Sequence, residues 1–164
     1  MPPLPDMGIE STMYGPISID HIHRDPNKDL IVYLVVVPSA GGRHRVRKND
    51  HWKLIWQIVD TPGRTVGRIL HIVRELGYNH LTNWGPLTKN LGDMTRDSEW
   101  FRVAEMTLAQ RKALEEIAKA EEVMEPDGEW NCQDWVVSVL EKAVQGELLT
   151  EEEVKWAIER AQGV

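Results

Sequence analysis

Residues 51–73 have the sequence HWKLIWQIVDTPGRTVGRILHIV, and this stretch decides the fold. Successive side chains of a strand point to opposite faces of the sheet. One face of residues 51–59 therefore carries Trp52, Leu54, Trp56 and Ile58, and the other carries His51, Lys53, Ile55 and Gln57. Residues 60–64, Asp-Thr-Pro-Gly-Arg, are a strong turn signal, and residues 65–73 form a second strand-like run. We predict an antiparallel hairpin.

The turn also predicts where the two histidines of this hairpin lie. If the turn centres near residues 61–63, paired positions sum to about 122–126 by antiparallel counting. His71 then lies opposite or diagonal to His51. The sequence leaves the exact register, and so the shared face, open.

Further strands are predicted on both sides of the hairpin. Residues 31–37 are continuous and β-branched, which is typical of a central strand buried on both faces and stopped by Pro38. Residues 17–22 alternate as in a short strand, and residues 100–106 are a further candidate. Residues 77–97 are irregular, so they predict a long loop that acts as a lid or holds a short strand.

Helices are predicted in the last third of the chain. Thr107 and Gln110 form a capping box, and residues 126–128 end that helix. Asn131 is a good N-cap for the helix that carries Cys132, and Gly146 is a good C-terminal stop. Thr150 caps a last helix that ends near residue 162.

Together these elements predict an α+β fold: an antiparallel sheet of about five strands with helices packed mainly on one side. Residues 17–164 form one domain, because 164 residues suit one moderate core. Residues 1–16 are rich in proline and glycine and are expected to be a flexible arm.

Composition excludes several classes of function. The net charge of −7 argues against non-specific nucleic-acid binding, and the basic residues 43–48 are best explained as a solvated loop. A single cysteine rules out an internal disulfide and suits a reducing compartment. No apolar run spans a bilayer and the start does not resemble a signal peptide, so we expect a cytoplasmic protein without a membrane anchor.

Cys132 and His51 are the candidate catalytic residues. A helix N-terminus carries partial positive charge, which favours thiolate at Cys132. A neighbouring imidazole can take the thiol proton and later return it. The alternatives are that Cys132 is a small core residue and that His51 is only a hydrogen-bonded histidine at a strand end.

The order of motifs resembles a known superfamily. Residues 33–37 (YLVVV), His51-Trp52 followed by Leu54, residues 69–73 (ILHIV) and the late Asn131-Cys132 helix occur in that order. The chain resembles the permuted, lecithin:retinol acyltransferase-like branch of the NlpC-type papain-like superfamily. It resembles more closely a family of small uncharacterised fungal proteins. The resemblance covers about residues 30–146.

This resemblance implies a papain-like (permuted) fold and roles for three residues. Cys132 would be the nucleophile, His51 the general base, and His71 the third polar group that orients the imidazole. Asp50, Gln57 and Asp60 are the alternative orienting groups.

Other side chains are candidates for binding. Trp84 and Trp100, near the irregular stretch, and Gln57 are the candidate substrate-binding residues. His44 and His80 are expected to face solvent. His21 and His23 are spaced two apart, but a metal site needs more ligands, so we expect neither metal nor cofactor.

The favoured function is a Cys/His thiol hydrolase or acyltransferase. It would act on an amide, ester or thioester of a small acyl or peptide substrate through a thioacyl-enzyme, with His51 deprotonating Cys132 or holding it as a thiolate–imidazolium pair. One alternative is a non-enzymatic protein-interaction module on the same fold. Another is a biosynthetic enzyme that uses the dyad for cyclisation or condensation. Acceptor and oligomeric state are not predicted.

Overall fold

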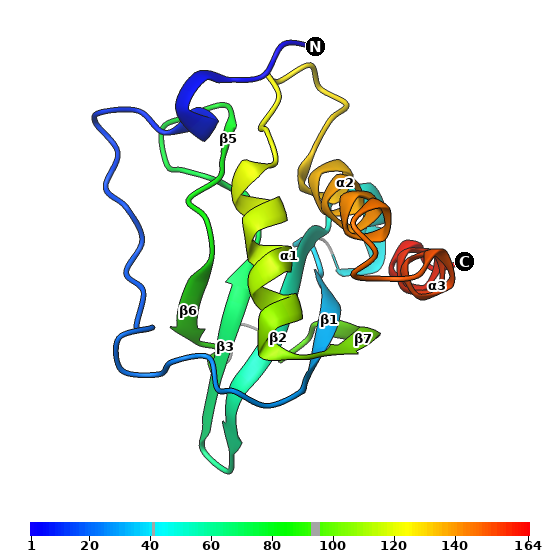
Figure 1. Cartoon of the computed structure of the whole chain (residues 1–164). Helices are drawn as coiled ribbons and strands as arrows, with labels where there is room; N and C mark the ends of the chain where they lie inside the picture. Colours follow the sequence, from blue (N-terminus) through cyan, green and yellow to red (C-terminus); the bar gives the residue numbers. More distant parts are fainter. Residues whose placement is uncertain (41, 93–95) are drawn as a thin grey trace.

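The computed structural model describes residues 1–40, 42–92 and 96–164. Its centre is a five-stranded antiparallel sheet with the strand order β6-β3-β2-β1-β7 (Figure 1). The strands of this sheet are β1 (Leu30–Val37), β2 (His51–Thr61), β3 (Arg64–Leu70), β6 (Leu87–Asn90) and β7 (Glu99–Met106). A separate two-stranded sheet pairs β4 (Val73–Arg74) with β5 (Leu81–Thr82).

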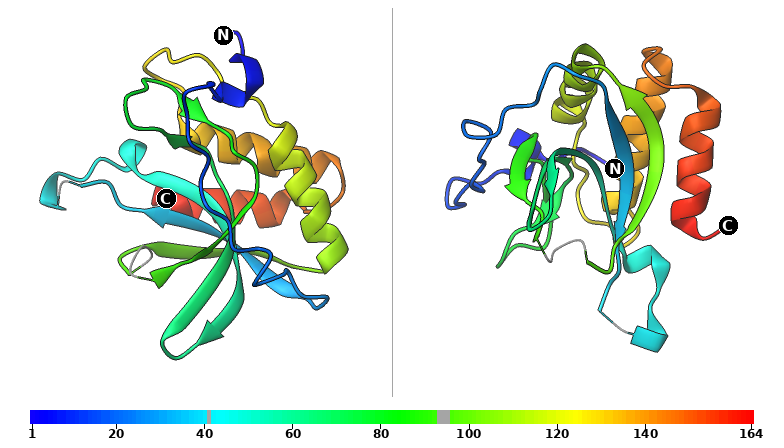
Figure 2. Two further views of the ribbon diagram at one scale, coloured as in Figure 1. Left: turned by 90° about the vertical axis from the view of Figure 1, so that its left-hand side faces the viewer. Right: turned by 90° about the horizontal axis from the view of Figure 1, so that it is seen from below.

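The described residues form three α-helices, α1 (Leu108–Ala120), α2 (Cys132–Gln145) and α3 (Glu151–Gln162), and short 3-10 helices at Pro5–Gly8, Gly42–His44 and Arg47–Asn49. Side chains of α1, α2 and α3 share one core with one face of the sheet. Figure 2 shows α2 and α3 on the same side of β1 and β7. The predicted α+β architecture with helices mainly on one side is confirmed. None of the described helices is long and apolar enough to cross a membrane.

The β2–β3 hairpin has the predicted register. Leu54 pairs with Leu70 and Gln57 with Gly67, and the register shifts between Gln57 and Val59. β3 ends at Leu70, one residue before His71. Continued by one step, the Leu54–Leu70 register would place His71 opposite Lys53 and therefore diagonal to His51.

The two faces of the sheet bury different cores. The helix side carries the large core with Trp52, Leu54 and Trp56. The opposite face carries a small core of Val35, Ile55, Ile69 and Leu91, against which Tyr33, Val37 and Trp100 pack. Alternation along β2 places His51 and Lys53 on the same face as Ile55, away from the helices.

The small core leaves no room at Gly67. A Cβ atom there would lie 2.8 Å from Leu91 Cδ1 and 3.0 Å from Ile55 Cγ2. We expect Gly67→Ala to lower the free energy of unfolding by about 1–3 kcal/mol through overpacking, measured by urea denaturation. Gly15→Ala is the control, because its Cβ would meet Trp84 at an ordinary 3.7 Å. Equal stability of the two variants would contradict the prediction.

Two segments differ from the predicted strands. Residues 17–22 form no strand; they only touch the edge strand β6, through Ile19 N–H donating to Thr88 O and Thr88 N–H donating to Ser18 Oγ. The irregular stretch 77–97 contributes β5 and the edge strand β6, and its residues 93–95 lie outside the described residues. Whether each of these segments forms a strand depends on contacts with residues that are distant in the sequence.

Residues 1–16, expected to be a flexible arm, lie against the domain. Leu4 N–H donates to Val123 O at 2.7 Å, and Asn83 N–H donates to Met7 O at 3.0 Å. Gly8 is buried with φ +79°, and a Cβ there would lie 2.4 Å from Leu81 O. Its carbonyl bonds His80 Nε2 at 2.9 Å. His80 is therefore buried, which corrects the expectation that it faces solvent, whereas His44 is exposed.

All three predicted helix starts are confirmed as capping boxes, at Thr107, Asn131 and Thr150. α1 ends earlier than predicted, at Ala120, because Glu121 is extended. The buried Glu121 carboxylate bonds Ser138 and Lys142 of α2. This contact joins the end of α1 to the helix that carries Cys132.

Candidate active site

Cys132 is the first residue of α2 and lies against the start of β2. The Asn131 side chain caps the helix by accepting from Gln133 N–H at 2.8 Å, and Asp134 accepts from Asn131 N–H at 2.8 Å. Cys132 is 8% exposed, and its thiol donates to Asp50 O at a Sγ–O distance of 3.8 Å. The Trp52 N–H also faces the sulfur. The thiol thus contacts backbone groups on both sides of His51.

The imidazoles of His51 and His71 are hydrogen-bonded to each other. His51 Nε2 lies 3.1 Å from His71 Nδ1, and the rings meet edge to face with centroids 5.3 Å apart. Among the described residues, no hydrogen bond joins Cys132 to either ring. The fold therefore pairs the two histidines directly on the sheet face away from the helices, whereas the Cys132 thiol belongs to the core on the helix side. The thiol contacts the backbone before and after His51, and in this structure the imidazole and the sulfur lie on opposite sides of β2.

Burial favours the uncharged forms of Cys132, His51 and His71. Burial raises the pKa of the Cys132 thiol, against the opposing effect of the backbone N–H of Trp52. Burial, and then the charge of Lys53, lower the pKa of His51 to about 4. The pKa of His71 is also lowered well below its ordinary value, first by burial and then by the charge of His51. These directions oppose a resting thiolate–imidazolium pair.

The histidine pair admits two tautomers, because one proton lies between the two bonded nitrogens. When His51 Nε2–H donates to His71 Nδ1, the Nδ1 of His51 is free to accept a proton. When His71 Nδ1–H donates instead, His51 carries its proton on Nδ1 and cannot act as a base there. Only the first tautomer supports general-base chemistry by His51.

Asp50 holds the loop before His51 and does not orient the imidazole. Its carboxylate accepts from Ser39 N–H at 2.9 Å and from Arg45 at 2.6 Å, and Arg45 also bonds Glu99 at 2.8 Å. Gln57 and Asp60 lie six and nine positions further along β2 than His51. Of the predicted orienting groups, His71 is the one bonded to the His51 ring.

Gln133 is a site residue that the sequence argument missed. Its side-chain amide donates to Arg47 O at 2.7 Å and to Asp50 O at 3.0 Å. It therefore ties the start of α2 to the chain that leads into His51. The sequence feature that could have indicated a role for Gln133 is its place next to Cys132 in the first helical turn. The Cys132 N–H faces its own thiol.

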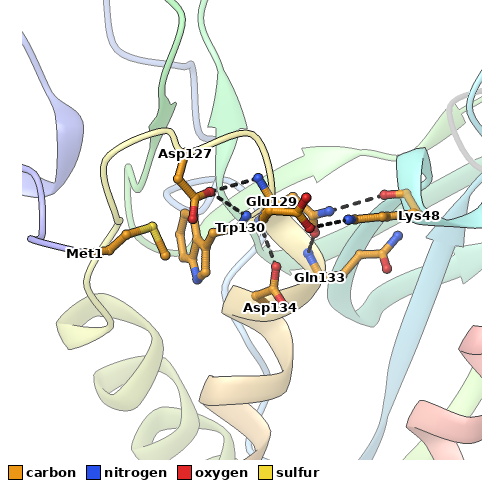
Figure 3. A pocket seen from close by; sticks show the side chains of 8 residues that line it. Met1, Lys48, Asp127, Glu129, Trp130, Gln133 and Asp134 are labelled. Atoms are coloured by element: carbon orange, nitrogen blue, oxygen red, sulfur yellow. Dashed lines mark hydrogen bonds and ion pairs between the residues drawn. The ribbon is translucent and has the colours of Figure 1, made fainter.

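An open pocket of about 340 Å³ adjoins the start of α2. The residues that line it are Met1, Lys48, Asp127, Glu129, Trp130, Asn131, Gln133 and Asp134 (Figure 3). Lys48 pairs with Glu129 at 2.8 Å. Cys132 does not line the pocket, so the pocket flanks the thiol without exposing it.

The predicted substrate-binding residues are spread over the molecule. Trp84 Nε1–H donates to Glu75 at 2.7 Å, and the ring lies beside Gly15. Trp100 packs edge to face on Tyr33 at 5.4 Å, on the sheet face that carries His51. Gln57 lines a separate hollow at the other end of β2. None of the three lines the pocket at α2.

Among the residues that the structure describes, no three or more His, Cys, Asp or Glu side chains lie together as a metal site. Comparison with known proteins gives no match, whether with family models, curated proteins or solved structures. The function of this chain is therefore inferred from its own geometry.

Proposed function

We propose that the chain is a cysteine-dependent hydrolase or acyltransferase with a permuted papain-like arrangement. The observation that carries the proposal is the 3.1 Å contact between His51 and His71, made beside a helix-start cysteine whose thiol touches the backbone of residues 50–52. It supports a Cys132–His51–His71 order of nucleophile, base and orienting group.

The uncharged resting site suits general-base attack. Cys132 Sγ attacks the carbonyl carbon of an amide, ester or thioester. Its proton passes to His51 Nδ1 through a bridging water, because the two side chains lie on opposite faces of the sheet. The resulting imidazolium is stabilised because His51 Nε2–H donates to His71 Nδ1. Collapse of the tetrahedral adduct breaks the bond to the leaving group, which takes the proton from His51. Water or an amine then attacks the thioacyl-enzyme, and the thiol regains its proton.

The Cys132 N–H, which faces the sulfur, is the candidate oxyanion donor, at the positive end of α2. Gln133, next to it, keeps its amide on Arg47 and Asp50 in this structure. We infer a small acyl or peptide substrate and a cytoplasmic site of action. Cyclisation or condensation would use the same nucleophile with an internal acceptor.

The test is acetylation of Cys132 by p-nitrophenyl acetate, followed by intact mass between pH 4 and pH 9. We expect the wild-type rate to rise near pH 4, where His51 loses its proton, and then stay level until the thiol titrates. In His51→Ala the rate should increase about tenfold per pH unit across that range, because only free thiolate reacts.

His44→Ala is the matched control, since His44 is exposed, and it should keep the wild-type profile. His71→Ala should lower the plateau, because the tautomer of His51 is no longer held. A wild-type profile that coincides with that of His51→Ala would refute the proposed base.

A second candidate is a non-enzymatic interaction module. The observation that favours it is the 8% exposure of Cys132 together with its raised pKa. An interaction module requires that Cys132 reacts no faster than a buried structural thiol at any pH. The same acetylation series distinguishes the two functions.

A further inference from the structure

The Lys53 side chain is largely buried, and its amine, which keeps contact with solvent, has no counter-ion among the described residues. The residue is 5% exposed, yet its amine has no hydrogen bond or ion pair among the residues that the structure describes. Partial desolvation of an ammonium group without a partner is costly, so lysine is rarely this little exposed. Burial and the nearby Lys89 lower the pKa of Lys53. A ligand that pairs with the amine would remove this cost.

The surroundings of Lys53 are basic. His51 lies two residues earlier on the same face of β2, and its ring bonds that of His71. Lys89 of β6 pairs with Gly67, and the Cβ direction of Gly67 leads to Ile55 and Leu91 of the small core. Lys53 and Lys89 are the side-chain cations that help to lower the pKa of His71. These four nitrogen-bearing groups therefore face the side of the sheet away from the helices.

We propose that Lys53, with His71 and Lys89 beside it, binds an oxyanion, a carboxylate or a phosphate, on this face of the sheet. The anion supplies a counter-ion that Lys53 does not have among the described residues. His71 adds a donor: when His51 Nε2–H donates to His71 Nδ1, the His71 proton is on Nε2 and is free for the ligand. The site does not require a reactive Cys132.

The proposed anion site includes His71, which is bonded to His51, and this gives the site a role in the proposed function. His51 and His71 are shared: the imidazole proposed as the base is bonded to the imidazole proposed to face the anion. A bound anion opposes the repulsion from Lys53 and Lys89, so it raises the pKa of both imidazoles. A negatively charged substrate would thus make His51 a stronger base as it binds.

The test is an NMR titration of the histidine ring signals of the full chain with sodium acetate and, separately, sodium phosphate, at constant ionic strength set with sodium chloride. We expect saturable shifts of the His51 and His71 signals and a rise of at least one unit in the pKa of His71. The tighter of the two anions identifies the carboxylate or the phosphate as the natural group.

Lys53→Met should weaken the binding at least tenfold, and Lys89→Met several-fold. Lys112→Met, an exposed lysine on α1, is the matched control and should bind as wild type does. Cys132→Ala should also bind as wild type does, which separates this site from the proposed catalysis. Shifts no larger than those from chloride, or wild-type affinity in a folded Lys53→Met, would overturn the proposal.

Discussion

Arg111→Met is expected to lower the free energy of unfolding by about 3–5 kcal/mol, because it breaks a buried ion pair from one side. The Arg111 guanidinium is fully buried and pairs with both carboxylate oxygens of Asp25. It also donates to the carbonyls of Pro26, Lys28 and Met106. Methionine fills similar space but leaves Asp25 and three carbonyls without these donors.

The measurement is the midpoint of urea denaturation at neutral pH. Lys112→Met is the control, since it makes the same change at the neighbouring exposed position of α1. Asp25→Asn in the Arg111→Met background should recover part of the loss, because it removes the unpaired charge; Trp56 Nε1–H still donates to that side chain. A loss below about 1 kcal/mol would show that the pair is not needed.

Asp50→Ala is expected to cost about 3 kcal/mol, the lower end of the range for a buried pair, because Arg45 is partly exposed and keeps Glu99. It should also slow acetylation of Cys132. Asp50 fixes the loop through Ser39 and Arg45, and its own carbonyl receives the thiol. Loss of the carboxylate therefore loosens the chain at the point where His51 is placed.

The stability lost in Asp50→Ala should decrease as the pH falls. Burial opposes ionisation of Asp50, but the hydrogen bonds from Arg45 and Ser39 outweigh it and lower its pKa. Its contribution to stability is complete above the unfolded pKa of about 4 and is lost as the pH falls through the folded value. The stability gap between wild type and Asp50→Ala should therefore narrow below pH 4.

Asp60→Ala is the matched control, because Asp60 is exposed near the end of the same strand and its side chain has no hydrogen-bond partner among the described residues. It should leave both the denaturation midpoint and the acetylation rate unchanged. Equal losses from Asp50→Ala and Asp60→Ala at neutral pH would mean that the loop is not held by Asp50.

The structural elements that the sequence predicts well are those that depend on residues close together in the chain. The hairpin followed from alternation over residues 51–59 and the turn at residues 60–64, and its observed pairs fall within the predicted register. The three capping boxes need only residues three apart, so they were predictable as well. The contact between His51 and His71 is the consequence of that register.

The elements that sequence predicts poorly depend on distant partners. Residues 17–22 have a strand pattern, but their contact with β6 is limited to the bonds with Thr88. Residues 1–16 have the composition of a flexible arm, but they bond Val123 and Asn83. Trp84, Trp100 and Gln57 are separated because they belong to different parts of the sheet and its surroundings.

The sequence by itself determined the hairpin, the helix starts and the places of Cys132, His51 and His71 along the chain, because each depends on neighbouring residues. The tertiary structure alone decided the charge state of the site. A helix N-terminus favours thiolate, yet the burial of Cys132 between α2 and β2 raises its pKa. It also decided that Lys53 is only 5% exposed, with no ion pair among the described residues. Desolvation depends on everything packed around a group, and no local pattern encodes that.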